Sequence, residues 1–192
     1  MSMQNSVVTH EAHRPYGIAT VAIDVTKQRE QEAFMHREAI TDALTRTWNR
    51  RVLLEAMQLH LQRNTGAGCV VLFCDVDDFR AVNNEHGHAC GDQLLVEVAT
   101  RLQEFAGAND LVARLRGDEF VFLLPGLEES KVPALVGRVQ RRMHEPLETK
   151  DAALPSSVNV GGAIGHPGED PVDVLAFADR SMYTRKSHRT TP

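Results

Sequence analysis

Residues 69–79 read CVVLFCDVDDF, a nearly continuous apolar run that ends in acidic side chains. A short apolar run of this kind is typical of a central β-strand that helices cover. Residues 111–124, LVARLRGDEFVFLL, contain two further apolar runs around a turn that holds Arg116 and Gly117. A glycine turn between two such runs predicts a β-hairpin. Together the two stretches predict three strands of one sheet.

Helical patterns alternate with these strands, and a strand with two glycines precedes the last helix. The other expected elements are helices at residues 49–63, from Asp92 onward, at 131–144 and from about Pro171 to Ser187, and a strand at 157–164. From residue 69 the order is β-α-β-β-α-β followed by a helix, which is the ferredoxin-like order. The predicted fold class is therefore α+β, a ferredoxin-like or palm βαββαβ antiparallel sheet with helices, which we expect on one face.

The segment before this unit has a different composition and predicts a separate part of the chain. Residues 1–25 combine a polar tail with an alternating strand at 17–25, GIATVAIDV. Residues 26–44 are rich in helix formers and contain neither Gly nor Pro, so they predict a linker helix. The expected organisation is a flexible tail and strand at 1–25, a linker helix at 26–44 and the main domain at 45–192.

The composition argues against several classes of protein. The 192 residues carry 21 Lys and Arg against 26 Asp and Glu, and this net charge of −5 argues against a general binder of nucleic acid polymers. The apolar runs fall well short of the roughly 18 residues of a membrane span, and the first residues lack the apolar stretch of a signal peptide. Three cysteines without a CxxC pair suit a reducing compartment. We therefore expect a cytoplasmic, soluble protein.

Two acidic clusters mark the ends of the expected central strands. Asp77 and Asp78 follow Asp75 at the end of the first strand, and Asp118 and Glu119 follow the hairpin turn. In this topology the third strand runs antiparallel beside the first, so Asp75 and Asp118 should meet at one edge of the sheet. Converging carboxylates beside a backbone carbonyl form an oxygen-rich site suited to Mg²⁺, which takes its remaining ligands from water and substrate phosphates. The acids therefore point to metal-assisted phosphate chemistry.

The same acids have a structural alternative as solvated turn and cap residues. Asp78 is best explained as the cap of a short helix that follows it. For Asp77 the two interpretations stay equally open. Asp75 favours the functional interpretation, because an acid that ends so apolar a run must emerge at an active edge or find a partner.

Residues 83–92, NNEHGHACGD, form a second polar cluster, whose glycines permit backbone turns that other residues resist. The amide of Asn83 and the carboxylate of Asp92 could together read the hydrogen-bonding edge of guanine. The alternative is structural, with Asn83 in a turn and Asp92 as a helix cap. We interpret His86 and His88 as surface or packing residues, since no further Cys or His stands at metal-ligand spacing.

Five segments, in the same order, resemble the motifs of the GGDEF family of diguanylate cyclases, and the resemblance covers roughly residues 40–190. Each motif alone is weak, whereas five in register are highly specific. The matching segments are Asp42-Ala-Leu-Thr45 with Asn49-Arg50-Arg51, Asp75-Val-Asp77-Asp-Phe79-Arg80, Asn83 to Asp92, Arg114-Leu-Arg116-Gly117-Asp118-Glu119-Phe120, and Ala178-Asp179 to Lys186. The strand at 17–25 and the helix at 26–44 also resemble the end of a PAS sensor and its signalling helix.

The resemblance implies a role for each matching residue. Asp75, Asp118 and the carbonyl of Val76 would hold Mg²⁺ (or Mn²⁺), with Glu119 assisting at the site. The residues implied to bind GTP are Asn83 and Asp92 at the guanine, Arg80 and Lys186 at the phosphates, and Gly117 at the turn that approaches them.

The resemblance also implies an activity. In the family each subunit binds one GTP, and each 3′-hydroxyl attacks the α-phosphate held by a facing subunit. This implies condensation of two GTP into cyclic di-GMP and pyrophosphate at a homodimer, with an upstream sensor and cyclic di-GMP effector proteins as partners. Two alternatives remain open. One is a degenerate GGDEF domain that binds GTP or serves in dimerisation or partner docking, and the other is a structural ferredoxin-like domain without a nucleotide.

The chain departs from the family motifs at several positions. Arg116 replaces the first signature glycine, where a positive φ would cost roughly a kcal/mol or more, although Arg116 could instead contact a phosphate. Arg46 stands where the opening motif has glycine, and Arg80 replaces a lysine, which keeps the charge but not the shape. Gly107 replaces the arginine of the product-binding R-x-x-D motif, so we expect no product feedback through that motif.

Overall fold

The computed structural model describes residues 2–9, 15–23, 26–27, 40–62, 68–148, 153–154 and 156–189. The chain divides into two compact units, residues 1–39 and residues 40–192. The second unit contains all the residues that the sequence singles out for chemistry.

The first unit contains a β-hairpin. Strands β1 (Ser2–Thr9) and β2 (Pro15–Ile23) pair antiparallel, with Ser2 opposite Ile23 and Val8 opposite Gly17. The alternating pattern predicts β2 to within two residues, and β1 lies in the stretch for which the sequence predicts a polar tail. A lone strand would leave a row of backbone N–H and C=O groups unpaired, and β1 supplies partners for them.

Residues 28–39 of the predicted linker helix lie outside the described residues. The helix does not extend to its predicted end at residue 44. Thr41 takes part in a β-bridge, and the carboxylate of Asp42 accepts a hydrogen bond from the backbone N–H of Thr45 at 2.9 Å. A local side-chain hydrogen bond of this kind competes with helical backbone bonding, so the chain turns here.

Five of the described strands form the central sheet of the second unit, in the order β3-β5-β6-β4-β9. Their bounds are Trp48–Asn49 for β3, Cys69–Val76 for β4, Leu111–Arg116 for β5, Glu119–Pro125 for β6 and Val158–Gly165 for β9. Strands β5, β6, β4 and β9 pair antiparallel in turn, and β3 runs parallel to β5. The predicted ferredoxin-like order is confirmed, with β3 added beside β5.

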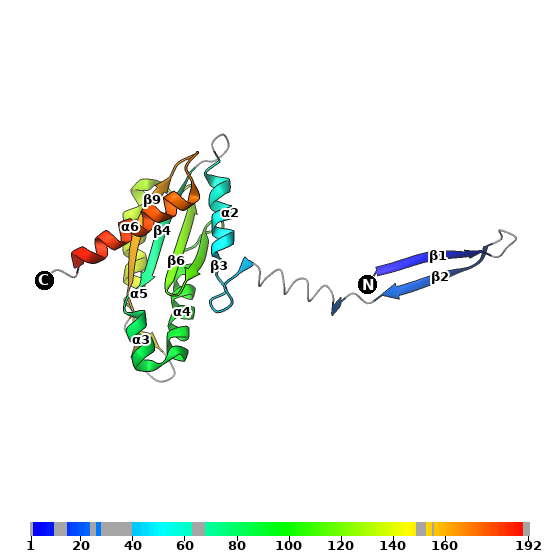
Figure 1. Ribbon diagram of the computed structural model, residues 1–192, viewed down its shortest axis with the longest axis horizontal. Coiled ribbons are helices and arrows are strands. Elements are labelled where there is room, and N and C mark those ends of the chain that lie inside the picture. Colours follow the sequence, from blue (N-terminus) through cyan, green and yellow to red (C-terminus); the bar gives the residue numbers. More distant parts are fainter. Residues whose placement is uncertain are drawn as a thin grey trace. The chain divides into compact units, whose positions relative to one another are not determined.

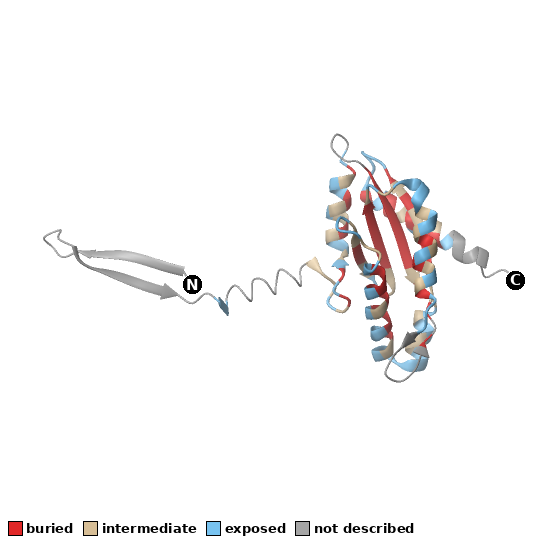
Figure 2. Ribbon diagram, turned by 180° about the vertical axis from the view of Figure 1, so that it is seen from behind, coloured by how far each residue is buried: buried red, intermediate tan, exposed pale blue. Residues whose placement is uncertain are grey.

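Helices cover both faces of this sheet (Figure 1), so the prediction of helices on one face is wrong. One face packs against α4 (His88–Gln103) and α5 (Val132–Met143), and the other against α2 (Arg50–His60) and α6 (Pro171–Arg189). Figure 2 shows the strands buried between these layers. The reason lies in β4, whose side chains from Cys69 to Cys74 are apolar and buried on both faces, so that each face needs a cover.

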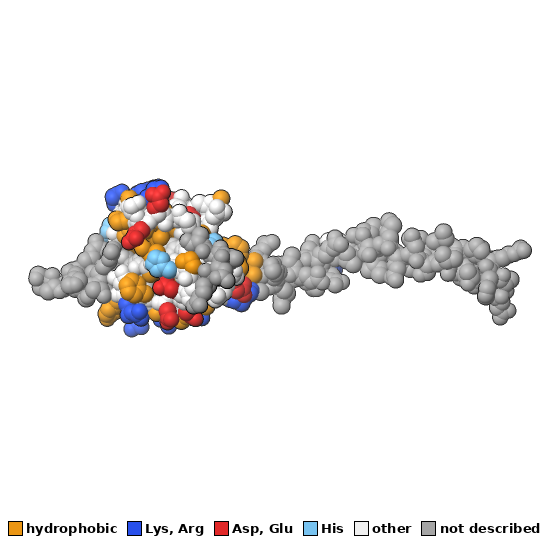
Figure 3. Space-filling model, turned by 90° about the horizontal axis from the view of Figure 1, so that it is seen from above, with side chains coloured by type: hydrophobic (Ala, Val, Ile, Leu, Met, Phe, Trp, Pro, Cys, Tyr) orange, Lys and Arg blue, Asp and Glu red, His pale blue; other side chains and the backbone are white. Residues whose placement is uncertain are grey.

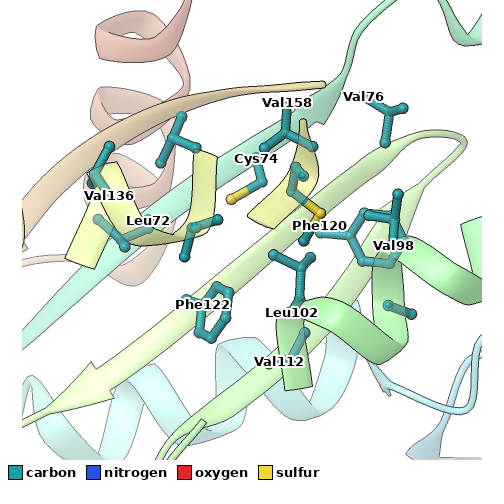
Figure 4. Packing of buried hydrophobic residues seen from close by; sticks show 14 of the residues in the cluster. Leu72, Cys74, Val76, Val98, Leu102, Val112, Phe120, Phe122, Val136 and Val158 are labelled. Carbon is teal, nitrogen blue, oxygen red and sulfur yellow. The ribbon is translucent and has the colours of Figure 1, made fainter. Parts of the chain in front are cut away.

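One apolar cluster lies between the sheet and the helices α4 and α5 (Figure 4). Leu72 and Cys74 of β4 and Phe120 and Phe122 of β6 meet Val98 of α4 there, and all five are fully buried. Burial of a large apolar side chain stabilises the fold by about 1.5–3 kcal/mol. Burial also raises the pKa of the Cys74 thiol to about 12, so Cys74 acts as a small apolar residue and not as a nucleophile.

Shorter elements complete the second unit. Helix α3 (Phe79–His86) follows β4, and the 3₁₀ helix η1 (Glu129–Lys131) precedes α5. Strands β7 (Leu147–Glu148) and β8 (Ala153–Leu154) form a small hairpin. The sequence predicts the short helix after β4, but it does not predict the strands between residues 147 and 154.

The surface of the described part is mixed in character. None of its helices is both long enough and apolar enough for a membrane span. On the face of the second unit that Figure 3 shows, acidic and basic side chains are interspersed. Such a face differs from the single-sign basic stripe that a nucleic acid backbone attracts.

Candidate functional site

The acidic edge of the sheet lies where β4 ends and β6 begins. Asp75 of β4 lies directly opposite Glu119 of β6 in the antiparallel register. The backbone N–H of Val76 donates to the carbonyl of Asp118 at 3.2 Å. Asp75, Asp118 and Glu119 are all half-buried. Two acidic segments far apart in the sequence therefore meet at one edge of the sheet.

The carboxylate of Asp77 is hydrogen-bonded to two residues at the start of β9 and just before it. It accepts hydrogen bonds from the hydroxyl of Ser157, at 2.6 Å, and from the side-chain amide of Asn159. The backbone N–H of Asp77 also donates to the carbonyl of Ser157 at 2.9 Å. These contacts favour the structural interpretation of Asp77, because they fix the start of the turn that leads from β4 into α3.

Asp78 occupies the N-cap position of α3 with a left-handed φ of 54°. It stands at the predicted cap position, but its side chain makes no capping hydrogen bond to the described first turn of the helix. The predicted cap position is therefore confirmed, without a side-chain capping hydrogen bond to the described helix. Asp tolerates left-handed backbone better than most residues do, so Asp78 contributes by permitting a tight turn.

Asn83 and Asp92 lie on the consecutive helices α3 and α4, which meet at Gly87. A Cβ atom at the buried Gly91 would collide with the side chain of Asn83, so this side chain lies against the first turns of α4. Asp92 follows Gly91 directly and is exposed. Its prediction as a helix cap is wrong, because α4 already begins at His88. The two candidate guanine-binding residues thus share one neighbourhood.

The turn between β5 and β6 depends on Gly117, which has a φ of 49°. Among the described non-glycine residues, positive φ values occur only at Arg46 and Asp78. Arg116 therefore keeps strand backbone, and the strain that a positive φ would cause at this position does not arise. The Nε of Arg114 donates to the carbonyl of Gly117 at 2.9 Å and so holds the turn from the strand side.

Arg116 forms an ion pair with Glu119, and its Nε lies 2.9 Å from the Oε2 of Glu119. The side chain of Arg116 is 81% exposed and that of Glu119 is 20% exposed. The hydrogen bond and the charge of Glu119, with a smaller contribution from Asp179, raise the pKa of the Arg116 guanidinium above its already high ordinary value. Glu119 thus already has a cationic neighbour.

Arg114 also connects the turn at Gly117, which we call the signature turn, with Asp42 at the start of the second unit. The sequence did not single out Asp42 as a functional residue. The Nη1 of Arg114 donates to the Oδ1 of Asp42 at 3.0 Å. The same oxygen accepts from the hydroxyl of Thr45 at 2.8 Å. Burial opposes ionisation, yet the hydrogen bonds from Thr45 and Arg114 hold the pKa of Asp42 below its usual value. The spacing of Asp42 and Thr45 signals a local hydrogen bond, but no sequence signal links either residue to Arg114.

Two predicted phosphate ligands lie on the helices α3 and α6. Arg80 is exposed on α3. Lys186 belongs to α6, but its side chain lies outside the described residues.

The candidate metal ligands are few, as Mg²⁺ permits. Within the described part of the chain, no three His, Cys, Asp or Glu side chains gather as a metal cluster. The predicted site needs only Asp75, Asp118 and the carbonyl of Val76. All three are oxygen donors, and Mg²⁺ commonly binds through one or two carboxylates while water and phosphate oxygens complete its shell. The donor atoms at this edge therefore match the ligand chemistry of Mg²⁺.

A comparison with known protein families matches a region that includes all of these residues. The family described as "Diguanylate cyclase, GGDEF domain" matches residues 39–191. The chain belongs to the GGDEF family. The matched region contains the acidic edge, the α3–α4 pair and the signature turn of this GGDEF domain.

Relatives with known names share this domain. The chain is 35% identical over 176 residues to the signaling protein YkoW of Bacillus subtilis, and the match covers 88% of this chain and 22% of YkoW. It is 34% identical over 152 residues to the bifunctional diguanylate cyclase/cyclic di-GMP phosphodiesterase MucR of Pseudomonas aeruginosa, with 77% of this chain and 22% of MucR covered. The GGDEF domain thus spans about a fifth of the length of these relatives.

A solved structure supports the fold. The coiled coil and GGDEF domain of DgcB from Caulobacter crescentus, crystallised in complex with c-di-GMP, superimposes with a TM-score of 0.77 at 26% sequence identity. The similarity covers 85% of this chain and 89% of that one. The predicted palm-like α+β class is therefore confirmed.

Proposed function

We propose that this GGDEF domain is a diguanylate cyclase, which condenses two GTP molecules into cyclic di-GMP and pyrophosphate with Mg²⁺ (or Mn²⁺). One observation carries the proposal. The antiparallel register of β4 and β6 sets Asp75 opposite Glu119 and sets the Asp118 carbonyl at the N–H of Val76. Membership of a family described as diguanylate cyclase supports the same activity.

Asp75, Asp118 and the carbonyl of Val76 would hold the metal ion, and Glu119 would assist there. Once bound, the ion supplies positive charge that lowers the charge on the attacked phosphate and helps to deprotonate the attacking hydroxyl. The strands that carry these donors are backed by the buried core, so the carboxylates are held on rigid elements.

The nucleotide would lie between the metal edge and the helices α3 and α4. The carboxylate of Asp92 would accept two N–H groups of the guanine, and the amide of Asn83 would pair with its remaining edge. Arg80 and Lys186 would contact the phosphates with charge-assisted hydrogen bonds. Gly117, which has no side chain, would let the backbone of the turn approach them.

The condensation requires two copies of the domain. Each copy would hold one GTP, and each 3′-hydroxyl would attack the α-phosphate of the nucleotide on the facing copy, so that pyrophosphate leaves. A two-fold homodimer gives both new bonds the same geometry. An upstream sensor would control how the copies meet, effector proteins would bind the product, and the cytoplasm is the expected compartment.

Chromatography of the products after incubation with GTP and Mg²⁺ tests this proposal. We expect cyclic di-GMP from the wild type and a loss on the order of 100-fold for Asp118→Asn, because the site loses charge where the transition state needs it. Asp173→Asn is the matched control, since Asp173 is an exposed acid in the first turn of α6, and it should keep the wild-type rate. GTP binding without any product would contradict the cyclase.

A second candidate is a GGDEF domain that binds GTP, dimerises or docks to a partner without catalysis. The ion pair between Arg116 and Glu119 favours it, because a signature acid is already neutralised. The product assay is therefore repeated on Arg116→Gly and compared with the wild type. Product from this variant alone would mean that the fold retains the chemistry and that Arg116 blocks it.

A further inference from the structure

Arg116 departs from the family signature, and its side chain has a defined position. Its Nε lies 2.9 Å from the Oε2 of Glu119, the residue that pairs with it across the hairpin. Gly117 takes the positive φ of the turn, so Arg116 reaches Glu119 without a left-handed backbone of its own. The β5–β6 register shifts between Arg114 and Arg116, so the contact lies at an irregular end of the hairpin that needs no left-handed φ at Arg116.

The two partners differ in their access to solvent. Arg116 is 81% exposed, whereas Glu119 is only 20% exposed. An exposed guanidinium leaves its partner at little cost because such pairs are weak, and the half-buried carboxylate stays at the edge of the sheet. Glu119 lies directly opposite Asp75, so a cation beside Glu119 also stands next to the proposed metal ligands.

A second acid acts on the same guanidinium. Asp179 of α6 is exposed, and its negative charge attracts the Arg116 guanidinium in addition to that of Glu119. If another cation takes Glu119, the negative charge of Asp179 still acts on Arg116. After release of Glu119, the charge of Asp179 therefore still offsets part of the charge of Arg116.

We infer that Arg116 is an internal counter-cation of Glu119 that competes with the divalent metal ion and thereby sets the metal affinity of the site. The inference rests on the proposed function, because it takes Asp75, Asp118 and the carbonyl of Val76 as the metal ligands and Glu119 as the acid that assists beside them. In the metal-free protein the guanidinium neutralises Glu119 and repels an approaching divalent ion. The site then binds metal more weakly than its carboxylates alone would. Salt screens this competition, since Arg116 is exposed.

Titration of Mn²⁺ into the nucleotide-free full chain, with free Mn²⁺ measured by electron paramagnetic resonance, tests the inference. We expect Arg116→Ala to bind Mn²⁺ about two- to tenfold more tightly at low ionic strength, because one like charge and one competing ion pair are removed. The gain should shrink at about 1 M salt, where the screening length falls to about 3 Å. Arg116→Lys keeps the charge and should stay close to the wild type.

Lys131→Ala is the matched control. Lys131 pairs with Glu128 at 3.1 Å with the same spacing of three residues, both side chains are exposed, and the pair lies beyond the opposite end of β6. An equal gain in Lys131→Ala would indicate a general charge effect and overturn the inference. Unchanged or weaker Mn²⁺ binding by Arg116→Ala would also overturn it. Arg116→Gln, which is closer in size, repeats the measurement if the alanine variant fails to fold.

Asp118→Asn distinguishes failure of the inference from failure of the proposed function. If Asp118→Asn binds Mn²⁺ as tightly as the wild type, or if neither the wild type nor Arg116→Ala binds it, the proposed metal site is wrong and the inference fails with it. If Asp118→Asn loses the binding while Arg116→Ala equals the wild type, only the inference fails.

Discussion

The Nη1 of Arg114 lies 3.0 Å from the Oδ1 of Asp42, a residue 72 positions earlier in the chain. The same arginine donates from its Nε to the carbonyl of Gly117 at 2.9 Å. One side chain therefore connects the first residues of the GGDEF domain with the turn that precedes Asp118. The side chains are 13% exposed at Arg114 and 26% at Asp42, so solvent screens their attraction only in part.

Asp42→Asn removes the anionic partner of Arg114 with little change in size. We expect the free energy of unfolding, measured in urea, to fall by about 1–3 kcal/mol, because a largely buried guanidinium is left without its counter-charge. Glu128→Gln is the control, since its ion pair with Lys131 is exposed and should contribute less than about 1 kcal/mol. Equal losses in the two variants would show that the link from Asp42 to Arg114 is unimportant.

The same carboxylate predicts a dependence of stability on pH. Hydrogen bonds from Thr45 and Arg114 lower the folded-state pKa of Asp42 below its ordinary value of 3.8. A group with a depressed folded pKa contributes stability that is present above its unfolded pKa and is lost as the pH falls through its folded pKa. The stability difference between the wild type and Asp42→Asn should therefore be constant from about pH 5 to 7 and shrink below about pH 4. Urea unfolding at a series of pH values measures it, and a difference that grows toward acid would contradict the lowered pKa.

Arg46 is exposed and has a left-handed φ of 60°. Left-handed backbone costs an L-residue about 1–2 kcal/mol, and glycine avoids this cost but loses more backbone entropy on folding. We expect Arg46→Gly to raise the free energy of unfolding by about 0.5–1 kcal/mol. Arg50→Gly, at an exposed position in the first turn of α2 with ordinary φ, should instead lower it. A gain at both positions would point to removal of positive charge as the cause.

Gly161 allows α6 to lie directly on β9. A Cβ atom there would collide with the backbone of Ala178 and Met182. Gly161→Ala should therefore reduce the free energy of unfolding by about 1–3 kcal/mol, as overpacked cores do. Gly162→Ala should cost less, because the tightest contact of its Cβ would be the flexible end of the Leu72 side chain, at 3.1 Å. Thermal or urea unfolding compares the two, and a larger loss at Gly162 would show that α6 can shift without cost.

Much of the fold was predictable because the strands of the sheet carry strong apolar runs. The run at 69–76 and the hairpin at 111–124 define three strands, and the antiparallel register of β4 and β6 follows from their order. The prediction failed where structure depends on a distant partner. Helices α2 and α6 lie outside the βαββαβ unit, so the strand order alone did not assign them to the second face, although the apolar side chains on both faces of β4 required a cover.

The candidate site, like the fold, was predictable in one part and not in another. Topology alone predicted that the segments of Asp75 and Asp118 meet, because both stand at the ends of adjacent strands. The role of Asp77 could not be predicted, since its partners Ser157 and Asn159 follow 80 and 82 positions later and reach it only through the register of β9. A carboxylate in a loop has the same appearance in sequence whether it binds a metal ion or an amide.

Asp77→Ala and Asp75→Asn should therefore separate stability from metal binding. Asp77→Ala leaves the amide of the buried Asn159 without this acceptor, so we expect a loss of about 1–3 kcal/mol in the free energy of unfolding. Its Mn²⁺ affinity should stay near that of the wild type. Asp75→Asn should weaken Mn²⁺ binding on the order of tenfold, because the charge of the ligand set falls. If Asp77→Ala weakens Mn²⁺ binding as much as Asp75→Asn does, Asp77 belongs to the metal site and its contacts with β9 are secondary.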